Sequence, residues 1–173
     1  FRSNLQYDKS ILEGYKNSNG DAAIVLNCDL QDPPELIEKF IYQWEQGSDV
    51  VYGVVNSRRE NFIINSLRKF FYYIMNSNTE IKYPLNAHDF RLLDKSIINE
   101  LKNTNNLFPY VRGLTYSLST KPYGVEYDRV ERSQGKSKFG FYNSFTYAIN
   151  AFIEETFLFT KIFRRITLVL LAS

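Results

Sequence analysis

The sequence predicts an α/β fold in which helices flank a sheet. Residues 22–26 and 49–55 are short apolar runs with the length and composition of buried strands. Apolar residues at helical spacing precede the first run, in residues 8–18, and follow it from residue 36 until Gly47 ends the pattern. Helix, strand, helix, strand is the order of a parallel α/β unit.

Five further elements are predicted between residues 57 and 130. They are a helix over residues 61–76, a short strand or turn at 88–94, helices at 95–102 and 108–118, and an edge strand at 124–130. Residues 131–140 are polar and contain glycine and lysine, so we expect a loop there.

Residues 141–165 form a helical, strongly aromatic pattern that ends in basic residues. This pattern suits a helix at the bilayer interface and equally a helix facing the core, so both interpretations stay open. Residues 166–173 are an apolar run behind Lys161, Arg164 and Arg165. Basic residues before such a run predict the start of a membrane helix, with an amphipathic C-terminal helix as the alternative.

Length and composition indicate one globular domain of 173 residues, 44% hydrophobic and 23% charged. The net charge of +2 is too small to indicate nucleic-acid binding, and acids at a strand end oppose a basic, aromatic nucleic-acid-binding module. We therefore expect no nucleic acid among the partners.

The first chemical signal is the acidic segment that follows residues 22–26. Asn27 and Asp29 come at the carboxyl end of the predicted strand, where open α/β sheets bind their ligands. Asp29 is a candidate Mg²⁺ ligand, since Mg²⁺ commonly takes one or two carboxylates plus substrate phosphates, and Gln31 or Asn27 would add an oxygen. Asp32 stands before two prolines, so we interpret it as a helix cap.

Two further clusters carry chemistry. His88 and Asp89 lie together in residues 88–94, and Asp89 is the preferred base because lone histidines are more often structural. Residues 129–138 combine arginine, glycine, serine and lysine, which fits either a phosphate clamp or a solvated basic loop. Arg58, Arg59 and Arg112 add further cations.

Five ordered motifs carry a family resemblance: residues 27–35 (NCDLQDPPE), 49–54 (DVVYGV), 88–94 (HDFRLLD), 112–114 (RGL) and 132–139 (RSQGKSKF). Together they resemble the family 2 glycosyltransferases of the dolichol-phosphate mannose synthase and bactoprenol (undecaprenyl-phosphate) glucosyltransferase type. The resemblance implies a GT-A (Rossmann-like) α/β fold with a mixed, mostly parallel sheet flanked by helices. It also implies a metal-dependent inverting enzyme at the cytoplasmic face of the cell membrane, which moves a sugar from a nucleotide-sugar donor to a polyprenyl-phosphate acceptor.

The motif match assigns roles to individual residues. Asp29, the second acid of an Asp-x-Asp motif, and Gln31 would bind Mg²⁺ or Mn²⁺, and Asn27, Asp29 and Arg58 would bind the donor. Asp89 would be catalytic. The predicted acceptor-phosphate-binding residues are Arg112, Arg132, Ser137 and Lys138.

Three departures qualify the match. Asn27 stands where the motif has its first acid, so one negative charge near the metal is missing, and His88 replaces a glycine. No counterpart of the family's first strands precedes residue 1. We therefore expect a chain truncated at both ends, inactive by itself: residues 1–140 as a partial GT-A domain, and 141–173 as amphipathic interfacial helices leading into a truncated membrane helix. A catalytically inactive nucleotide-sugar-binding or membrane-docked relative is the alternative, and a homo-oligomer stays open.

Overall fold

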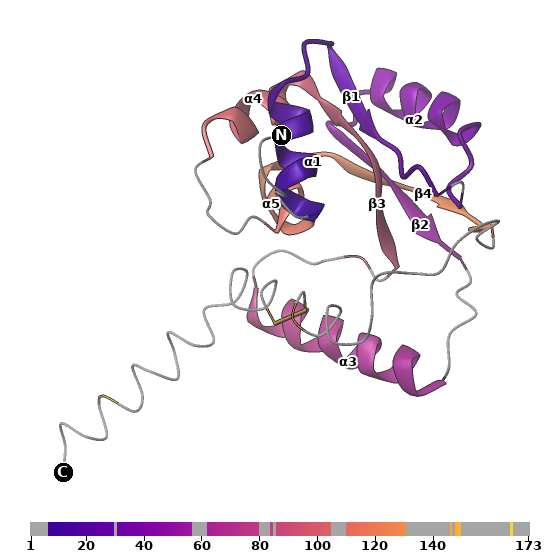
Figure 1. Cartoon of the computed structure of the whole chain (residues 1–173), viewed down its shortest axis with the longest axis vertical. Helices are drawn as coiled ribbons and strands as arrows, with labels where there is room; N and C mark the ends of the chain where they lie inside the picture. Colours follow the sequence, from indigo (N-terminus) through magenta and orange to yellow (C-terminus); the bar gives the residue numbers. More distant parts are fainter. Residues whose placement is uncertain are drawn as a thin grey trace.

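The computed structural model describes residues 7–29, 31–56, 62–79, 84, 86–104 and 110–130, together with 146, 148, 149 and 167. Four strands form one sheet in the order β1-β3-β2-β4 (Figure 1). They are β1 (Ala22–Val25), β2 (Val50–Val55), β3 (Ala87–Asp94) and β4 (Pro122–Tyr127). β3 is antiparallel to β1 and β2, and β4 is parallel to β2, so three of the four strands share one direction. The predicted α/β fold with a mixed sheet is confirmed.

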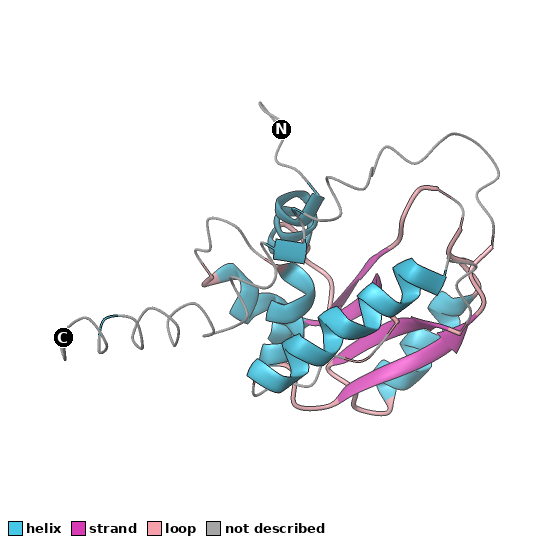
Figure 2. Ribbon diagram, turned by 90° about the horizontal axis from the view of Figure 1, so that it is seen from below, coloured by secondary structure: helices cyan, strands magenta, loops and turns pink. Residues whose placement is uncertain are grey.

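Helices cover both faces of this sheet (Figure 2). α2 (Leu36–Glu45) packs on one face, while α1 (Tyr7–Lys16), α4 (Lys95–Lys102) and α5 (Val111–Leu118) pack together on the other (Figure 1). Neighbouring strand residues point to opposite faces, so Val50 and Leu93 join the second layer, and Val51 and Leu92 join α2. α3 (Phe62–Asn78) packs through Tyr72 and Met75 against the start of β3 and against α5.

Residues 88–94, predicted as a short strand or turn, belong to the longer strand β3, which pairs on both sides. Phe90 and Leu92 are buried toward one face, and Arg91 and Leu93 toward the other. A strand covered on both faces shows no alternation of apolar and polar residues, which explains the uncertain prediction.

The interpretation of Asp32 as a helix cap is wrong. α2 begins at Leu36, and its N-cap residue is Glu35, whose side chain makes no capping hydrogen bond. The two prolines form turns instead, in which the Leu36 amide donates to the Pro33 carbonyl at 3.2 Å. Asp32 is therefore available for contacts elsewhere in the fold.

Several predicted features lie outside the described residues. They include Arg58, Arg132, Ser137 and Lys138, and nearly all of residues 141–173 with their predicted interfacial and membrane helices. Within the part of the chain that the structure describes, no helix is long and apolar enough to span a membrane.

Candidate functional site

The candidate site lies where β1 and β4 end and β3 begins. Because β3 runs against β1 and β2, its first residues meet the last residues of the other strands at one edge of the sheet. Pairing of Val25 with Arg91 places the loop after β1 beside Asp89. The chain after β4 is tied to the same loop, since the Val130 amide donates to the Gln31 carbonyl at 3.0 Å.

Asp32 connects the loop after β1 to the end of β4 and is only 1% exposed. Its Oδ1 accepts hydrogen bonds from the Tyr127 hydroxyl at 2.6 Å and from Arg129 Nε at 3.0 Å. Its Oδ2 accepts a hydrogen bond from Asn27 Nδ2 at 3.2 Å. Gly53 makes this possible, because a Cβ there would lie 2.6 Å from the Tyr127 ring. The buried carboxylate thus holds together segments far apart in the sequence.

Asp29 and Gln31, the two predicted metal ligands, lie on the same loop near solvent. Asp29 Oδ1 accepts a hydrogen bond from the Gln31 amide at 3.3 Å, and its Oδ2 accepts one from Arg129 NH2 at 3.5 Å. Gln31 Nε2 donates to the Val130 carbonyl at 3.1 Å, so its side-chain oxygen is the atom left to act as a ligand. The Asp29 side chain is 22% exposed.

These oxygen atoms fit Mg²⁺ or Mn²⁺. One carboxylate and one amide oxygen are enough for such a site, because Mg²⁺ keeps several waters and takes substrate phosphates. Among the described residues, no group of three or more His, Cys, Asp or Glu side chains could hold a metal ion. Asn27 is engaged elsewhere: its amide donates to Asp32, and its Oδ1 accepts from the Tyr7 hydroxyl at 3.3 Å. The candidate ligands are therefore Asp29 and Gln31.

Asp89 and Arg112, the predicted catalytic residue and the predicted phosphate-binding arginine, form a bidentate ion pair. Arg112 Nε donates to Asp89 Oδ1 at 3.0 Å, and its NH2 donates to Oδ2 at 2.8 Å. Burial alone would raise the pKa of Asp89, but the Arg112 guanidinium outweighs it and holds that pKa below its ordinary value. Asp89 is therefore ionised at neutral pH and is a weak proton acceptor.

Arg91 holds α5 against β3, and this contact places Arg112 beside Asp89. It is 2% exposed, and its NH2 donates to the His88 carbonyl at 3.2 Å. Its NH1 donates to the Arg112 carbonyl at 3.4 Å and to the Thr115 hydroxyl, both in α5. This buried guanidinium links β3 to α5 and so fixes the ion pair in position.

His88 fits a structural role. Burial lowers its pKa to about 4, despite the opposing charge of Asp32, so the imidazole is neutral at pH 7. Its Nδ1 accepts a hydrogen bond from the Phe90 amide at 3.4 Å and lies 3.6 Å from Asp32 Oδ2. A neutral histidine in this position is a packing neighbour of the carboxylate and does not form an ion pair with it.

Tyr7 joins the two halves of the site from α1. Its hydroxyl lies 3.3 Å from Asn27 Oδ1 and 3.3 Å from Asp89 Oδ2, so its proton is shared between them. Although the residue is 40% exposed, desolvation of the hydroxyl, reinforced by the nearby Asp89 charge, raises the pKa of Tyr7 above its ordinary value. The phenol stays protonated at neutral pH and acts as a donor.

Replacing Tyr7 with Phe should lower the free energy of unfolding by about 1 kcal/mol, the net value of one hydrogen bond. The measurement is chemical denaturation of the intact protein. Tyr42→Phe is the matched control, because Tyr42 is 57% exposed and lies outside the site, and it should change stability by less than about 0.5 kcal/mol. Equal effects of the two substitutions would contradict the bridging role of Tyr7.

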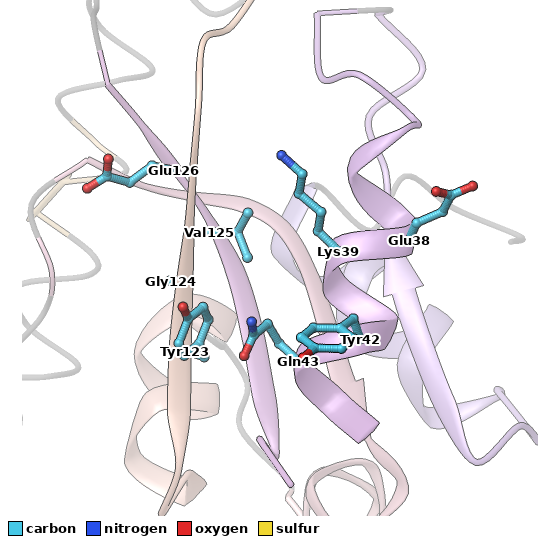
Figure 3. A pocket seen from close by; sticks show the side chains of 8 residues that line it. All are labelled: Glu38, Lys39, Tyr42, Gln43, Tyr123, Gly124, Val125 and Glu126. Carbon is cyan, nitrogen blue, oxygen red and sulfur yellow. The ribbon is translucent and has the colours of Figure 1, made fainter. Parts of the chain in front are cut away.

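A shallow groove of about 580 Å³ lies apart from these residues, between α2 and β4 (Figure 3). Tyr42 and Gln43 of α2 face Tyr123 and Val125 of β4 across it. None of the predicted site residues lines it. The chemistry of the sequence motifs therefore belongs to the edge of the sheet and not to this groove.

Comparison with known proteins shows the family of the chain. The family model described as glycosyl transferase family 2 matches residues 1–102. The chain belongs to this family. Its relatives include the uncharacterized glycosyltransferase YkcC of Bacillus subtilis, 37% identical over 80% of this chain and 43% of its own length. The uncharacterized glycosyltransferase sll0501 of Synechocystis is 31% identical over 92% of this chain and 50% of its own length.

The bactoprenol glucosyl transferase of Shigella phage SfX is 29% identical over 80% of this chain and 46% of its own length. The chain thus spans about half the length of the curated relatives it matches. Family membership and the mixed sheet together support the GT-A-like fold implied by the sequence motifs.

The Tyr7 hydroxyl connects Asn27 to Asp89, which Arg112 holds, and Asp29 and Gln31 lie on the loop that carries Asn27. The roles assigned to these residues stay predictions. The structure also places Arg129 and Tyr7 among the contacts of the site, which the motif match did not predict. Arg129 begins the basic segment predicted as a phosphate clamp, so its charge was visible in the sequence, but its contacts with Asp29 and Asp32 were not. Nothing in the local pattern pointed to Tyr7, whose contacts come from the way α1 packs.

Proposed function

We propose that the intact protein is a metal-dependent inverting glycosyltransferase that moves a sugar from a nucleotide-sugar donor to a polyprenyl-phosphate acceptor. The observation that carries the proposal is the Asp89–Arg112 ion pair at the sheet end from which the Asp29 loop leaves, in a chain of glycosyl transferase family 2. The bactoprenol glucosyl transferases among its relatives favour a lipid phosphate as acceptor. Such an acceptor implies work at the cytoplasmic face of the cell membrane.

Asp29 and Gln31 would hold Mg²⁺ or Mn²⁺, which when bound neutralises the diphosphate leaving group. An acceptor phosphate oxygen forms a bond to the anomeric carbon as the bond to the donor diphosphate breaks on the opposite side. The nucleoside diphosphate leaves, and the configuration is inverted. Arg132, Ser137 and Lys138, together with Arg58 on the donor side, are proposed phosphate contacts that lie outside the described residues.

Asp89 orients the acceptor in this scheme and does not need to take its proton. The second pKa of a phosphate monoester is about 6, so the acceptor is mostly dianionic at neutral pH. Arg112 holds the Asp89 carboxylate by two hydrogen bonds, which fixes its direction and weakens it as a base. Arg112 would thus act on the acceptor side partly through Asp89.

The transfer rate should rise with pH along a single step with an apparent pKa of about 6, the value for the acceptor phosphate. Asp89 adds no step there, because its pKa lies below its ordinary value and it stays ionised throughout. The measurement is a pH–rate profile of the intact protein and of Asp89→Asn. The substitution should lower the rate at every pH and keep the step. Loss of the step in Asp89→Asn would show that Asp89 is the titrating base.

The proposed function itself is tested by incubating the intact protein with radiolabelled nucleotide sugars, polyprenyl phosphate and Mn²⁺, and extracting the lipid. Label in a polyprenyl-phosphate sugar, absent without Mn²⁺, is the expected result. Transfer to a soluble glycan and none to lipid would overturn the acceptor assignment.

One observation favours the alternative of an inactive nucleotide-sugar-binding relative. Asn27 replaces an acid and is hydrogen-bonded on both sides of its amide, to Asp32 and to Tyr7. The metal site would then have a single carboxylate and bind nucleotide phosphates without turnover. Mn²⁺-dependent binding of a nucleoside diphosphate with no sugar transfer to any acceptor would establish this alternative.

A further inference from the structure

We propose that Arg129 is a positioning residue of the donor site: it neutralises Asp29 in the free protein and turns to the donor diphosphate when a divalent cation is bound. The proposal rests on the proposed metal-dependent function. The phosphate-binding motif matched in the sequence begins at Arg132, so the motif gives Arg129 no role of its own. The contacts of Arg129 in the structure indicate the role proposed here.

Arg129 contacts Asp29 and Asp32 in the loop after β1, but unequally. Its Nε donates to Asp32 Oδ1 at 3.0 Å, and the Asp32 side chain is 0% exposed. Its NH2 reaches Asp29 Oδ2 at 3.5 Å, where the side chains are 26% and 22% exposed. The shorter, buried contact is the anchor, and the longer contact near solvent is the one that can be exchanged.

A guanidinium on Asp29 competes with a divalent cation for the same carboxylate. Both carry positive charge, so a cation that binds Asp29 is repelled while NH2 stays there. Release of Asp29 need not release Asp32, because the two contacts use different nitrogen atoms of the guanidinium. The guanidinium can therefore turn about its anchor and remain in the site.

The backbone keeps Arg129 within reach after that turn. Val130 donates its amide to the Gln31 carbonyl at 3.0 Å, and its carbonyl accepts from Gln31 Nε2 at 3.1 Å. The segment after β4 is thus fastened to the candidate metal-binding loop through both the backbone and the side chain of Gln31. A guanidinium held there is well suited to a diphosphate, since its planar donors match phosphate oxygens in pairs.

Under this proposal, loss of Arg129 changes two affinities in opposite directions: the affinity for Mn²⁺ alone and the affinity for a diphosphate in the presence of Mn²⁺. Binding of Mn²⁺ to the intact protein is measured from the electron paramagnetic resonance signal of free Mn²⁺, and binding of inorganic pyrophosphate at saturating Mn²⁺ by calorimetry. In Arg129→Gln, Mn²⁺ alone should bind about three- to tenfold more tightly, the range expected for one partly solvated charge. Pyrophosphate should bind about tenfold more weakly, because a charge-assisted contact is lost. Damage to the fold would weaken both.

Two controls complete the experiment. Lys95→Gln removes the same charge at an exposed pair with Asp21, away from the site, and should leave both affinities unchanged. Arg129→Lys retains the charge, but one ammonium cannot span both carboxylates. It should show the same two changes at about threefold, and it serves if Arg129→Gln does not fold.

Asp29→Asn separates the two ideas under test. If this substitution leaves Mn²⁺ binding unchanged, the proposed metal site itself is wrong. If it abolishes Mn²⁺ binding while both Arg129 variants bind Mn²⁺ no more tightly than the wild type, the metal site stands and the role of Arg129 is overturned. Unchanged pyrophosphate binding in those variants overturns it as well.

Discussion

Asp29→Asn is expected to lower sugar transfer by the intact protein about 10²- to 10³-fold, the usual cost of removing one electrostatic stabiliser of a transition state. The side chain keeps its size and one oxygen, so the loop should keep its shape. What disappears is the carboxylate charge that would hold the divalent cation against the leaving diphosphate. Because Asn27 is already neutral, the substitution leaves residues 27–31 without a carboxylate.

The matched control lies at the other end of the same strand. Asp21 precedes β1, and its side chain is 83% exposed, so Asp21→Asn makes the same chemical change outside the site. It should leave transfer unchanged. The measurement is initial rate against Mn²⁺ concentration, in which Asp29→Asn should also need more Mn²⁺ for half-maximal rate. Undiminished transfer in Asp29→Asn would remove the metal role from this residue.

The helices and outer strands of the fold could be predicted because their signals are local. Residues 95–102 carry Ile97, Ile98 and Leu101 at helical spacing, and α4 has those bounds. Asp94 accepts a hydrogen bond from the Ser96 amide at 2.7 Å and caps this helix. β3 was harder to predict. Its backbone pairs with β1 on one edge and with β2 on the other, and both of these strands are distant from it in the sequence.

In the candidate site, too, features with a local or motif signal could be predicted, and contacts between distant residues could not. The prediction that Asp29 and Asp89 share one site rests on the resemblance of the motifs, since no local pattern indicates that residues 27–32 lie near residue 89. The prediction that Asp32 caps a helix is wrong because a carboxylate before two prolines resembles a helix start. Its partners in the structure, Tyr127 and Arg129, lie almost a hundred residues away in the sequence. Long-range ion pairs leave no periodic trace in a sequence.

In the free protein the candidate site is neutralised by its own arginines. Arg112 holds Asp89 by two hydrogen bonds, and Arg129 holds Asp32 and Asp29. Ion pairs of this kind hold the carboxylates in a fixed direction without a substrate. They also indicate which ligands the site can bind. Phosphates can replace the carboxylates as partners of the arginines, and a cation can replace Arg129 as the partner of Asp29.

The effect of Asp32→Asn on stability distinguishes the predicted helix cap from the observed contacts, because the two lead to different expected losses. Asparagine caps a helix as well as aspartate does, so a cap residue would tolerate the change within a few tenths of a kcal/mol. In the structure, the change removes a buried charge from Arg129 and turns an amide donor toward the Asn27 amide or the Tyr127 hydroxyl, both of which donate to Asp32. Breaking a buried ion pair costs about 3–5 kcal/mol, and partial exposure of Arg129 reduces this to about 2–3 kcal/mol.

Chemical denaturation of the intact protein measures the difference, with Glu35→Gln as the control. Glu35 occupies the N-cap position of α2 and makes no capping bond through its side chain, so its substitution should change the free energy of unfolding by less than about 0.5 kcal/mol. An equally small effect of Asp32→Asn would contradict the observed contacts. A loss above about 2 kcal/mol is larger than a helix cap contributes and would identify Asp32 as the residue that fastens the end of β4, and with it Arg129, to the candidate site.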